Sequence, residues 1–384
     1  IDNDIINLGF WPGGDRDGNP FVTTQITLDV AERLRQTILR NYYRDVRRLK
    51  RRFTFNGVQE ILSRVEKRLY KHVIRSYEKI NFSQKILLDE LYAARDIIEK
   101  QHQSLFIEEL NDFINKVRIF GFHFATLDIR QDSRVHHQAF TQIVTDLLAT
   151  GDTTFPKNYH SLSEAEQIEI LSLVKGKIEP SILSDEMSVS TIESIYALKT
   201  IQQRNGERGA NRYIISNNQS ALNVMQTFGM LNLCGFENEL PVDVIPLFET
   251  VDDLENSSQV MRTLYSNHAY RYHLTKRKNK QTVMLGFSDG TKDGGYLMAN
   301  WGIFKAKEAL TKISREFDVE VIFFDGRGGP PARGGGKTHQ FYASLGPTIE
   351  DKEIQLTIQG QTISSNFGTE ESSQFNLEQL LSSG

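Results

Sequence analysis

Apolar residues recur at spacings of three and four along the first third of the chain, from about Thr27 to Phe120. This spacing places them on one side of an α-helix, so the pattern predicts long amphipathic helices. Nothing in this span has the pattern of a strand. The predicted helical segments are 28–46, 58–74, 85–100 and 105–117. We therefore expect residues 1–120 to form a region of loop and long helices.

The pattern changes after residue 120 to short apolar runs that alternate with helical segments. The predicted strands are 124–129, 212–216, 242–248, 282–288 and 319–324, and the predicted helices are 133–149, 220–231, 251–266 and 295–313. Such alternation is typical of a parallel sheet, either closed or open. We expect residues 121–384 to form this α/β part, with a helical insertion at about 150–187.

Glycine and arginine dominate the segment FFDGRGGPPARGGGKTH, which begins at Phe323. Its letters GKT match the end of a nucleotide-binding phosphate loop, but that motif needs a glycine five positions before Gly336. Pro331 stands there, and proline has no N–H to donate to a phosphate oxygen. The phosphate-loop interpretation therefore fails on register.

What remains is a loop over residues 326–337 that presents Arg327 and Arg333. Glycine permits unusual backbone angles, and arginine offers a planar fork to a carboxylate or a phosphate. We expect a mobile loop that binds an anion. A flexible surface loop with solvated arginines is the alternative.

Composition narrows the function classes. A formal net charge of −4 argues against nucleic acid as the main partner, and Cys234 is the only cysteine, which excludes a disulfide framework and fits a reducing cytosol. No apolar run reaches the length of a membrane span, and the N-terminus lacks the character of a signal peptide. We expect a cytoplasmic protein that does not bind membranes. Because Ile1 is not a methionine, we also expect the chain to be a portion of a longer one.

Polar side chains gather where the predicted strands end. They are Asp128, Arg130, Glu249, Asp289 and Arg327. In parallel α/β folds the carboxyl ends of the strands meet on one side, where ligands bind. Carboxylate oxygens suit Mg²⁺ or Mn²⁺, and arginines suit a phosphorylated or carboxylated substrate. Helix caps and surface ion pairs are the alternative interpretation. The adjacent residues His136 and His137 cannot share one side of a helix, so we interpret them as ordinary helix residues.

Six motifs occur in an order and spacing that resemble the phosphoenolpyruvate carboxylase family. They are GFWPGGDRDGNPFVT, LDIRQDS, PLFETVDDL, VMLGFSDGTKDGG, GRGGPPARGGG and TIQGQTISSNFG. The resemblance covers essentially the whole chain, but only the central part of the family's length. The family's N-terminal region, with a catalytic histidine in a His-Pro motif, and its C-terminal region, with further substrate and inhibitor arginines, have no counterpart here.

The resemblance implies a helix-rich (β/α) barrel, incomplete in this chain, and a role for each of nine residues. Mg²⁺ or Mn²⁺ would be held by Glu249 and Asp289; Arg130 and Arg327 would belong to the anion pocket and Arg333 to the mobile loop; Trp11 and Gln359 would handle bicarbonate or CO₂; Leu247 and Met284 would surround the substrate methylene.

The resemblance also implies the reaction. Phosphoenolpyruvate and bicarbonate would give oxaloacetate and phosphate through carboxyphosphate and an enolate whose oxygen the metal stabilises. The full-length protein would be a homotetramer. Residues 1–384 alone would be inactive, because the catalytic histidine is missing.

Two departures from the family pattern leave the closing of the loop an open question. Asp325 stands where the family usually has histidine, and Pro330 and Pro331 stiffen one side of the loop. The charged string of residues 15–17, Asp15, Arg16 and Asp17, is either functional or architectural. Two other function classes also stay open: a nucleotide-binding domain built on the GGGKT segment, and a non-catalytic barrel that binds a phosphorylated metabolite.

Overall fold

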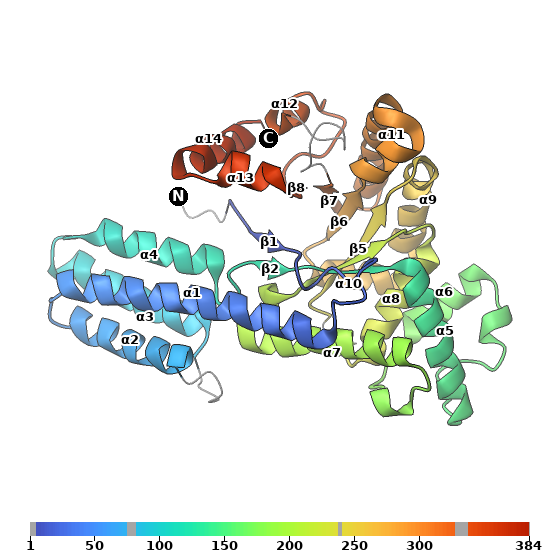
Figure 1. The fold of residues 1–384 in the computed structure, drawn as a ribbon, viewed down its shortest axis with the longest axis horizontal. Coiled ribbons are helices and arrows are strands. Elements are labelled where there is room, and N and C mark those ends of the chain that lie inside the picture. The colour runs from blue at the N-terminus through green and yellow to red at the C-terminus, as the bar shows by residue number, and fades with distance from the viewer. Residues whose placement is uncertain (1–4, 75–81, 237–239, 327–336, 384) are drawn as a thin grey trace. The chain divides into compact units, whose positions relative to one another are not determined.

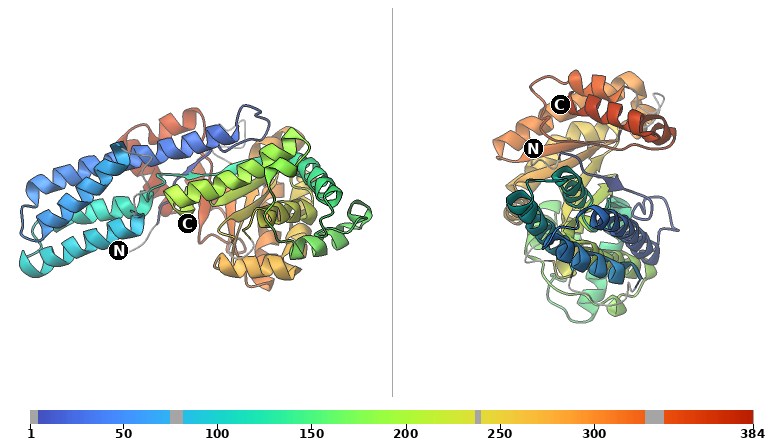
Figure 2. Two further views of the ribbon diagram at one scale, coloured as in Figure 1. Left: turned by 90° about the horizontal axis from the view of Figure 1, so that it is seen from below. Right: turned by 90° about the vertical axis from the view of Figure 1, so that its left-hand side faces the viewer.

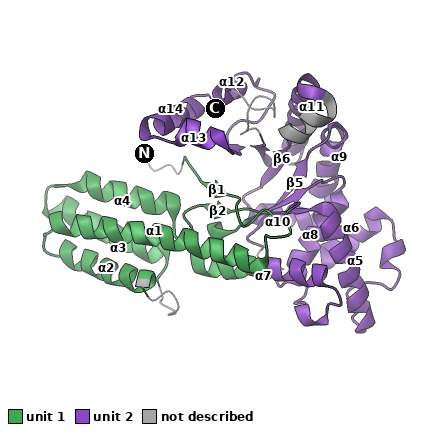
Figure 3. Cartoon of the chain, viewed as in Figure 1, with its two compact units in different colours: residues 1–15, 19–129, 196–211 green, residues 16–18, 130–195, 212–384 purple. Residues whose placement is uncertain are grey.

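A computed structural model describes residues 5–74, 82–236, 240–326 and 337–383, without the side chains of residues 74 and 287–294 (Figure 1). The chain divides into two compact units (Figure 3). Unit 1 comprises Ile1–Asp15, Asn19–Ile129 and Tyr196–Asn211, and unit 2 comprises Arg16–Gly18, Arg130–Ile195 and Arg212–Gly384. The expected division into domains 1–120 and 121–384 stays a prediction.

Unit 1 is built on four long helices, which confirm the four predicted helical segments. They are α1 (Thr24–Arg52), α2 (Val58–Ile74), α3 (Gln84–Gln101) and α4 (Ile107–Phe120). Figure 2 shows them running side by side. Their apolar sides share one core, which includes Leu39, Tyr42, Val46, Leu62, Leu91, Ala94, Phe113 and Val117. Hydroxyl caps start two of them, because Thr23 accepts a hydrogen bond from the backbone of Ile26 and Ser83 accepts one from Ile86.

Two further pieces complete unit 1. The strand β1 (Gly9–Phe10), which the sequence pattern did not indicate, pairs in parallel with β2 (Thr126–Leu127). The second half of α7 (Glu186–Asn205) ends beside α1, where the side chain of Asn205 donates a 2.9 Å hydrogen bond to the carbonyl of Ala31. Segments far apart in the sequence therefore form one packed unit.

Unit 2 contains a sheet whose strands follow one another in the order of the chain. These strands are β3 (Ile129–Asp132), β4 (Arg212–Ser216), β5 (Asp243–Phe248), β6 (Lys280–Leu285), β7 (Glu320–Asp325) and β8 (Ile354–Leu356). The pairings from β4 to β8 are all parallel. This confirms the predicted parallel α/β class, and four of the predicted strands correspond to β4, β5, β6 and β7.

Helices connect these strands. They are α5 (Ser133–Ala149), α6 (Glu164–Leu173), α7, α8 (Ala221–Leu233), α9 (Val251–Ser266), α10 (His268–Lys276) and α11 (Phe287–Glu316), and after β7 come α12 (Thr338–Ala343), α13 (Gln361–Phe367) and α14 (Glu370–Leu381). Short 3₁₀ turns lie at Tyr159–Ser161, Pro180–Ile182 and Glu207–Gly209. Among the helices of the described residues, none has the length and apolar character needed to cross a membrane.

Two of the strand boundaries predicted from the sequence were wrong. The run predicted as one strand over 124–129 is divided, because residues 126–127 pair with β1 while β3 begins at Ile129. The strand predicted to reach residue 288 ends at Leu285, and α11 begins at Phe287. Gly295, with φ 78° and ψ 167°, interrupts α11 where the sequence pattern placed its start.

Candidate active site at the carboxyl ends of the strands

The ends of β5, β6 and β7 meet through the residues that follow them. The N–H of Gly286 donates to the carbonyl of Phe248 at 2.9 Å, and the N–H of Gly326 donates to Leu285 at 3.0 Å. A Cβ atom added to Gly286 would lie 3.2 Å from both Cα and Cγ of Glu249. Glycine at 286 therefore lets the side chain of Glu249 lie against the end of β6.

Glu249 follows β5 directly, as the sequence predicted, and its carboxylate is held in place. Its Oε2 accepts the backbone N–H of Asn217 at 2.7 Å. Asn217 is itself fixed, since the hydroxyl of Ser133 donates to its carbonyl at 2.6 Å and its φ is +51°. A non-glycine residue in the left-handed region is uncommon and indicates a locally determined backbone.

The next residues start a helix and do not add a ligand. Thr250 is the N-cap of α9, and its side chain accepts the N–H of Asp253 at 3.1 Å. The carboxylate of Asp253 accepts the N–H of Thr250 at 3.0 Å in return, which completes a capping box. The acidic run in PLFETVDDL thus supplies one site carboxylate, Glu249, and one capping carboxylate.

The predicted second metal ligand, Asp289, is the third residue of α11, whose N-cap is Gly286. Its side chain lies outside the described part. Among the described side chains no group of three His, Cys, Asp or Glu could hold a metal ion. Glu249 packs against Gly286, three residues before Asp289, and this placement fits a Mg²⁺ or Mn²⁺ site of few protein ligands, since these ions keep several waters.

Leu247 and Met284 are brought together, as the sequence resemblance implied. They are register partners on β5 and β6, and both side chains are buried. Gln281, three residues before Met284, accepts a 2.8 Å hydrogen bond from Tyr270 of α10. Because strand side chains alternate, Met284 points to the face opposite α10, and Leu247 shares that face.

Sequence reasoning missed two polar side chains beside this pair. The register of β4 and β5 places Ser216 beside Leu247, and the N–H of Asn218 donates to the carbonyl of Leu247 at 3.2 Å. The hydroxyl of Ser216 and the amide of Asn218 are buried, and neither has a hydrogen-bond partner among the described residues. A buried amide normally finds one, so this strand end suits a polar ligand. The run SNNQS after an apolar strand gave no usable signal, because such a run is equally typical of an ordinary turn.

Arg130 lies inside β3, and not after a strand as the sequence pattern indicated. Its guanidinium is 3.6 Å from the carboxylate of Asp17. The neighbouring Arg16 donates its N–H to the carbonyl of Arg130 at 2.9 Å, and its side chain donates to the hydroxyl of Ser190 at 2.6 Å. The string DRD is therefore architectural at Arg16, and Asp17 orients the predicted anion-binding arginine.

Trp11 and Asp128 contact each other within unit 1. The indole Nε1 donates to Oδ2 of Asp128 at 2.9 Å, and Asp128 is 1% exposed. Gly14 must be glycine here, because a Cβ would lie 2.0 Å from the carbonyl oxygen of Asp128. Asp128 is therefore paired with Trp11, and its expected place among the site carboxylates stays a prediction.

Three more predicted residues are less constrained by the structure. Gln359 is exposed in the segment between β8 and α13. Arg327 and Arg333 lie outside the described residues, together with most of the expected mobile loop at 326–337. Their roles stay predictions.

His136 is a core residue of unit 2, in agreement with its interpretation as an ordinary helix residue. Its Nε2 lies 3.0 Å from the hydroxyl of Tyr213, and its Nδ1 lies 3.0 Å from that of Thr227. Burial, aided by the charge of Arg16, lowers the pKa of His136 to about 3. The imidazole is therefore neutral at physiological pH and serves packing.

Taken together, these features define a parallel α/β protein whose strand ends carry one fixed carboxylate, two neighbouring glycines and an apolar pair. The family model of phosphoenolpyruvate carboxylase matches residues 1–92 and 52–383, so the chain belongs to that family. Two curated relatives named phosphoenolpyruvate carboxylase, from Nitrosomonas eutropha and Nitrosomonas europaea, are 33% and 32% identical over 98% of this chain. The chain spans 45% of the length of each.

Proposed function

We propose that the full-length protein containing this chain carboxylates phosphoenolpyruvate with bicarbonate to give oxaloacetate and phosphate. The observation that carries this proposal is Glu249 at the end of β5, whose carboxylate accepts the N–H of Asn217 and whose Cα and Cγ pack against Gly286. Membership of the phosphoenolpyruvate carboxylase family supports it. We further propose that the parallel sheet of unit 2 is part of a closed (β/α) barrel.

The arginines bind the two anionic groups of the substrate. Arg130 and Arg327 hold phosphate and carboxylate, because the guanidinium fork matches both groups. Asp17, 3.6 Å from Arg130, keeps that guanidinium oriented before substrate arrives. Arg333 covers the site when substrate is bound.

Glu249 and Asp289 hold Mg²⁺ or Mn²⁺ in this proposal. A divalent cation there supplies positive charge where the substrate's enol oxygen becomes negative. Asn217 fixes one oxygen of Glu249, so the other oxygen has a defined direction. The protein's contribution is thus a carboxylate that needs no reorganisation during the reaction.

Bond changes follow from the charges that the site can stabilise. A bicarbonate oxygen attacks phosphorus, and the bond from phosphorus to the enol oxygen breaks, which yields carboxyphosphate and an enolate. Carboxyphosphate releases CO₂ and phosphate, and CO₂ then bonds to the methylene carbon. Leu247 and Met284 exclude water that would protonate that carbon. Trp11 and Gln359 handle bicarbonate or CO₂.

Oxygen-18 in bicarbonate tests this sequence of bonds. The attacking oxygen stays on phosphorus, so the full-length protein should produce phosphate that carries one bicarbonate oxygen, together with oxaloacetate. Oxaloacetate with unlabelled phosphate would exclude the carboxyphosphate route. Affinity for phosphoenolpyruvate without any oxaloacetate would favour the non-catalytic binder, and nucleotide binding that Lys337→Ala abolishes would favour the nucleotide-binding alternative.

Two properties of the whole protein complete the proposal. We expect the full-length protein to be a homotetramer, as the family resemblance implies. We also expect it to be cytoplasmic, since a single free cysteine, Cys234, fits a reducing compartment. We expect residues 1–384 alone to be inactive.

A further inference from the structure

A buried ionic cluster joins β7 to two helices. Asp325, the last residue of β7, has no exposed surface, and its Oδ2 accepts hydrogen bonds from Lys307 of α11 at 2.8 Å and from Tyr342 of α12 at 2.7 Å. Lys307 is 1% exposed and Tyr342 is 5% exposed. Asp325 is the residue at which the sequence departs from the family pattern, and the structure supplies a partner set for it.

Aromatic rings surround the ammonium group of Lys307. Its Nζ lies 5.0 Å from the ring centre of Phe323, 5.1 Å from that of Phe341 and 5.6 Å from that of Tyr342. Cation–π attraction of this kind is strongest where water is excluded. Phe341 and Tyr342 both belong to α12, so Lys307 holds this short helix by its rings as well as through Asp325.

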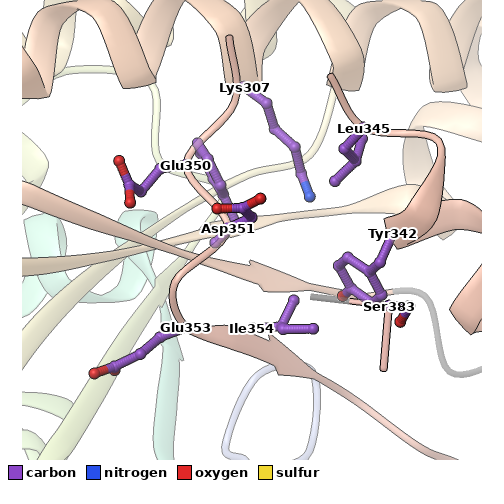
Figure 4. A pocket seen from close by; sticks show the side chains of 9 residues that line it. Lys307, Tyr342, Leu345, Glu350, Asp351, Glu353, Ile354 and Ser383 are labelled. Carbon is purple, nitrogen blue, oxygen red and sulfur yellow. The ribbon is translucent and has the colours of Figure 1, made fainter. Parts of the chain in front are cut away.

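A small hollow lies next to the cluster. Lys307 and Tyr342 line it together with Ile354 and the acidic residues Glu350 and Glu353 (Figure 4). The volume open to the centre of a water molecule is about 10 Å³, which is room for about one water. This hollow is too small for a substrate, so the cluster is not itself a binding site.

The cluster specifies geometry more than it adds stability. Removing two charges from water costs free energy, and apolar residues of similar volume often stabilise a core equally well. Both donors reach the same carboxylate oxygen, whereas Oδ1 of Asp325 is buried and has no partner within the described part of the chain. An arrangement that leaves one oxygen unsatisfied costs free energy of folding. We therefore infer that the cluster serves to fix the position of the backbone.

The chain positions show what is held. Asp325 immediately precedes Gly326, and Tyr342 lies in the helix that begins at Thr338. One carboxylate therefore joins the residue before segment 327–336 to the helix after it. Gly326 is also fixed to the candidate site, because its N–H donates to Leu285, one residue before Gly286.

We propose that Lys307, Asp325 and Tyr342 are positioning residues, which fix the points where segment 327–336 leaves and rejoins the fold. The joining of the two ends rests on the contacts above. Its consequence, correct placement of Gly326 and the end of β6 beside Glu249 for binding phosphoenolpyruvate, rests on the proposed function.

Hydrogen exchange tests whether the cluster joins the end of β7 to α12, and this measurement does not depend on enzymatic activity. Tyr342→Phe in the full-length protein removes one hydroxyl and keeps the ring. We expect the amides of α12 to exchange at least about tenfold faster, while β4, β5 and β6 keep their protection. Tyr296→Phe, at an exposed tyrosine of α11, is the matched control and should change neither. Unchanged protection of α12 in Tyr342→Phe would overturn the proposal.

Steady-state kinetics tests the placement. Tyr342→Phe and Asp325→Asn should raise KM for phosphoenolpyruvate at least about fivefold and leave KM for bicarbonate within about twofold. A merely structural defect would lower kcat and leave both KM values unchanged, which would contradict the positioning role. Lys307→Met should raise KM for phosphoenolpyruvate more than the double variant Lys307→Met with Asp325→Asn does. The single variant leaves Asp325 as an unpaired buried charge, whereas the double variant leaves none. Lys305→Met, an exposed lysine on the same helix, is the control.

The two proposals fail in different ways. If the wild-type full-length protein makes no oxaloacetate, the proposed function fails, and hydrogen exchange alone decides the joining of the two ends. If oxaloacetate forms and α12 loosens in Tyr342→Phe with unchanged KM for phosphoenolpyruvate, the positioning role is overturned while the proposed function stands.

Discussion

At the scale of single residues, the sequence indicated Glu249 as a candidate site residue and did not indicate the polar groups that surround it. Glu249 could be predicted because a carboxylate directly after a buried strand of a parallel sheet is an informative position. Asn217 and Asn218 could not, because asparagine after a strand is typical of an ordinary turn. Only the structure shows that the N–H of Asn217 holds Glu249 and that the amide of Asn218 is buried with no partner in the residues that the structure describes.

For a substitution of Asn218 we predict that stability is kept or increased while activity falls. Asn218→Leu removes an unsatisfied buried amide, whose burial costs about 1–3 kcal/mol, so urea denaturation should show equal or greater stability. Turnover by the full-length variant should fall at least about tenfold, because we expect this amide to bind a polar ligand. A clear loss of stability would show that the amide has a structural partner and would contradict this reading.

His136 gives a prediction for pH. Its pKa is about 3 in the folded protein and about 6.5 when unfolded, so acid protonates the unfolded chain first. Its contribution to stability is therefore complete above about pH 6.5 and decreases as the pH falls toward 3, by up to about 1.4 kcal/mol per pH unit.

The measurement is urea denaturation of His136→Gln and of the control His160→Gln, at an exposed histidine. His136→Gln should be less stable at neutral pH but lose less stability on acidification. The control should follow the wild type at every pH. A pH slope in His136→Gln equal to that of the wild type would show that other groups dominate the acid response.

At the scale of elements, the fold was predictable where an element is long or fully buried. The four helices of unit 1 and strands β4 to β7 have strong periodic or apolar patterns. The strands β1 and β8 were missed because they are two and three residues long and only partly buried. The divided run at 124–129 could not be recognised either, since pairing with two different sheets leaves no local signal.

Gly286 gives a prediction for the junction of β6 and α11. Gly286→Ala would place a Cβ 3.2 Å from Cα and Cγ of Glu249, which must shift. We expect turnover of the full-length protein to fall at least about tenfold with the fold intact by circular dichroism. Gly302→Ala, in the same helix, meets only an ordinary 3.5 Å contact with Leu254 and is the control. Equal turnover in the two variants would show that the placement of Glu249 is unimportant.

At the scale of the whole molecule, the chain spans 45% of the length of its curated relatives, so we propose the activity for a full-length protein and not for this chain alone. We predict that residues 1–384 alone turn over roughly 10²–10⁴-fold more slowly, the usual cost of losing one acid/base or positioning group. Oxaloacetate formation at equal concentrations of the two proteins, coupled to malate dehydrogenase, measures the ratio. Comparable rates would show that residues 1–384 hold a complete site.

The most direct test of the central claim is the bicarbonate-dependent formation of oxaloacetate by the full-length protein, compared with its Glu249→Gln variant. Glu255→Gln, at an exposed residue of α9, is the control. We predict that the wild type and the control form oxaloacetate at the same rate with Mg²⁺ or Mn²⁺. Glu249→Gln should be at least about 10²-fold slower, because the site loses its fixed carboxylate. Full activity in Glu249→Gln, or no oxaloacetate from the wild type, would contradict the account.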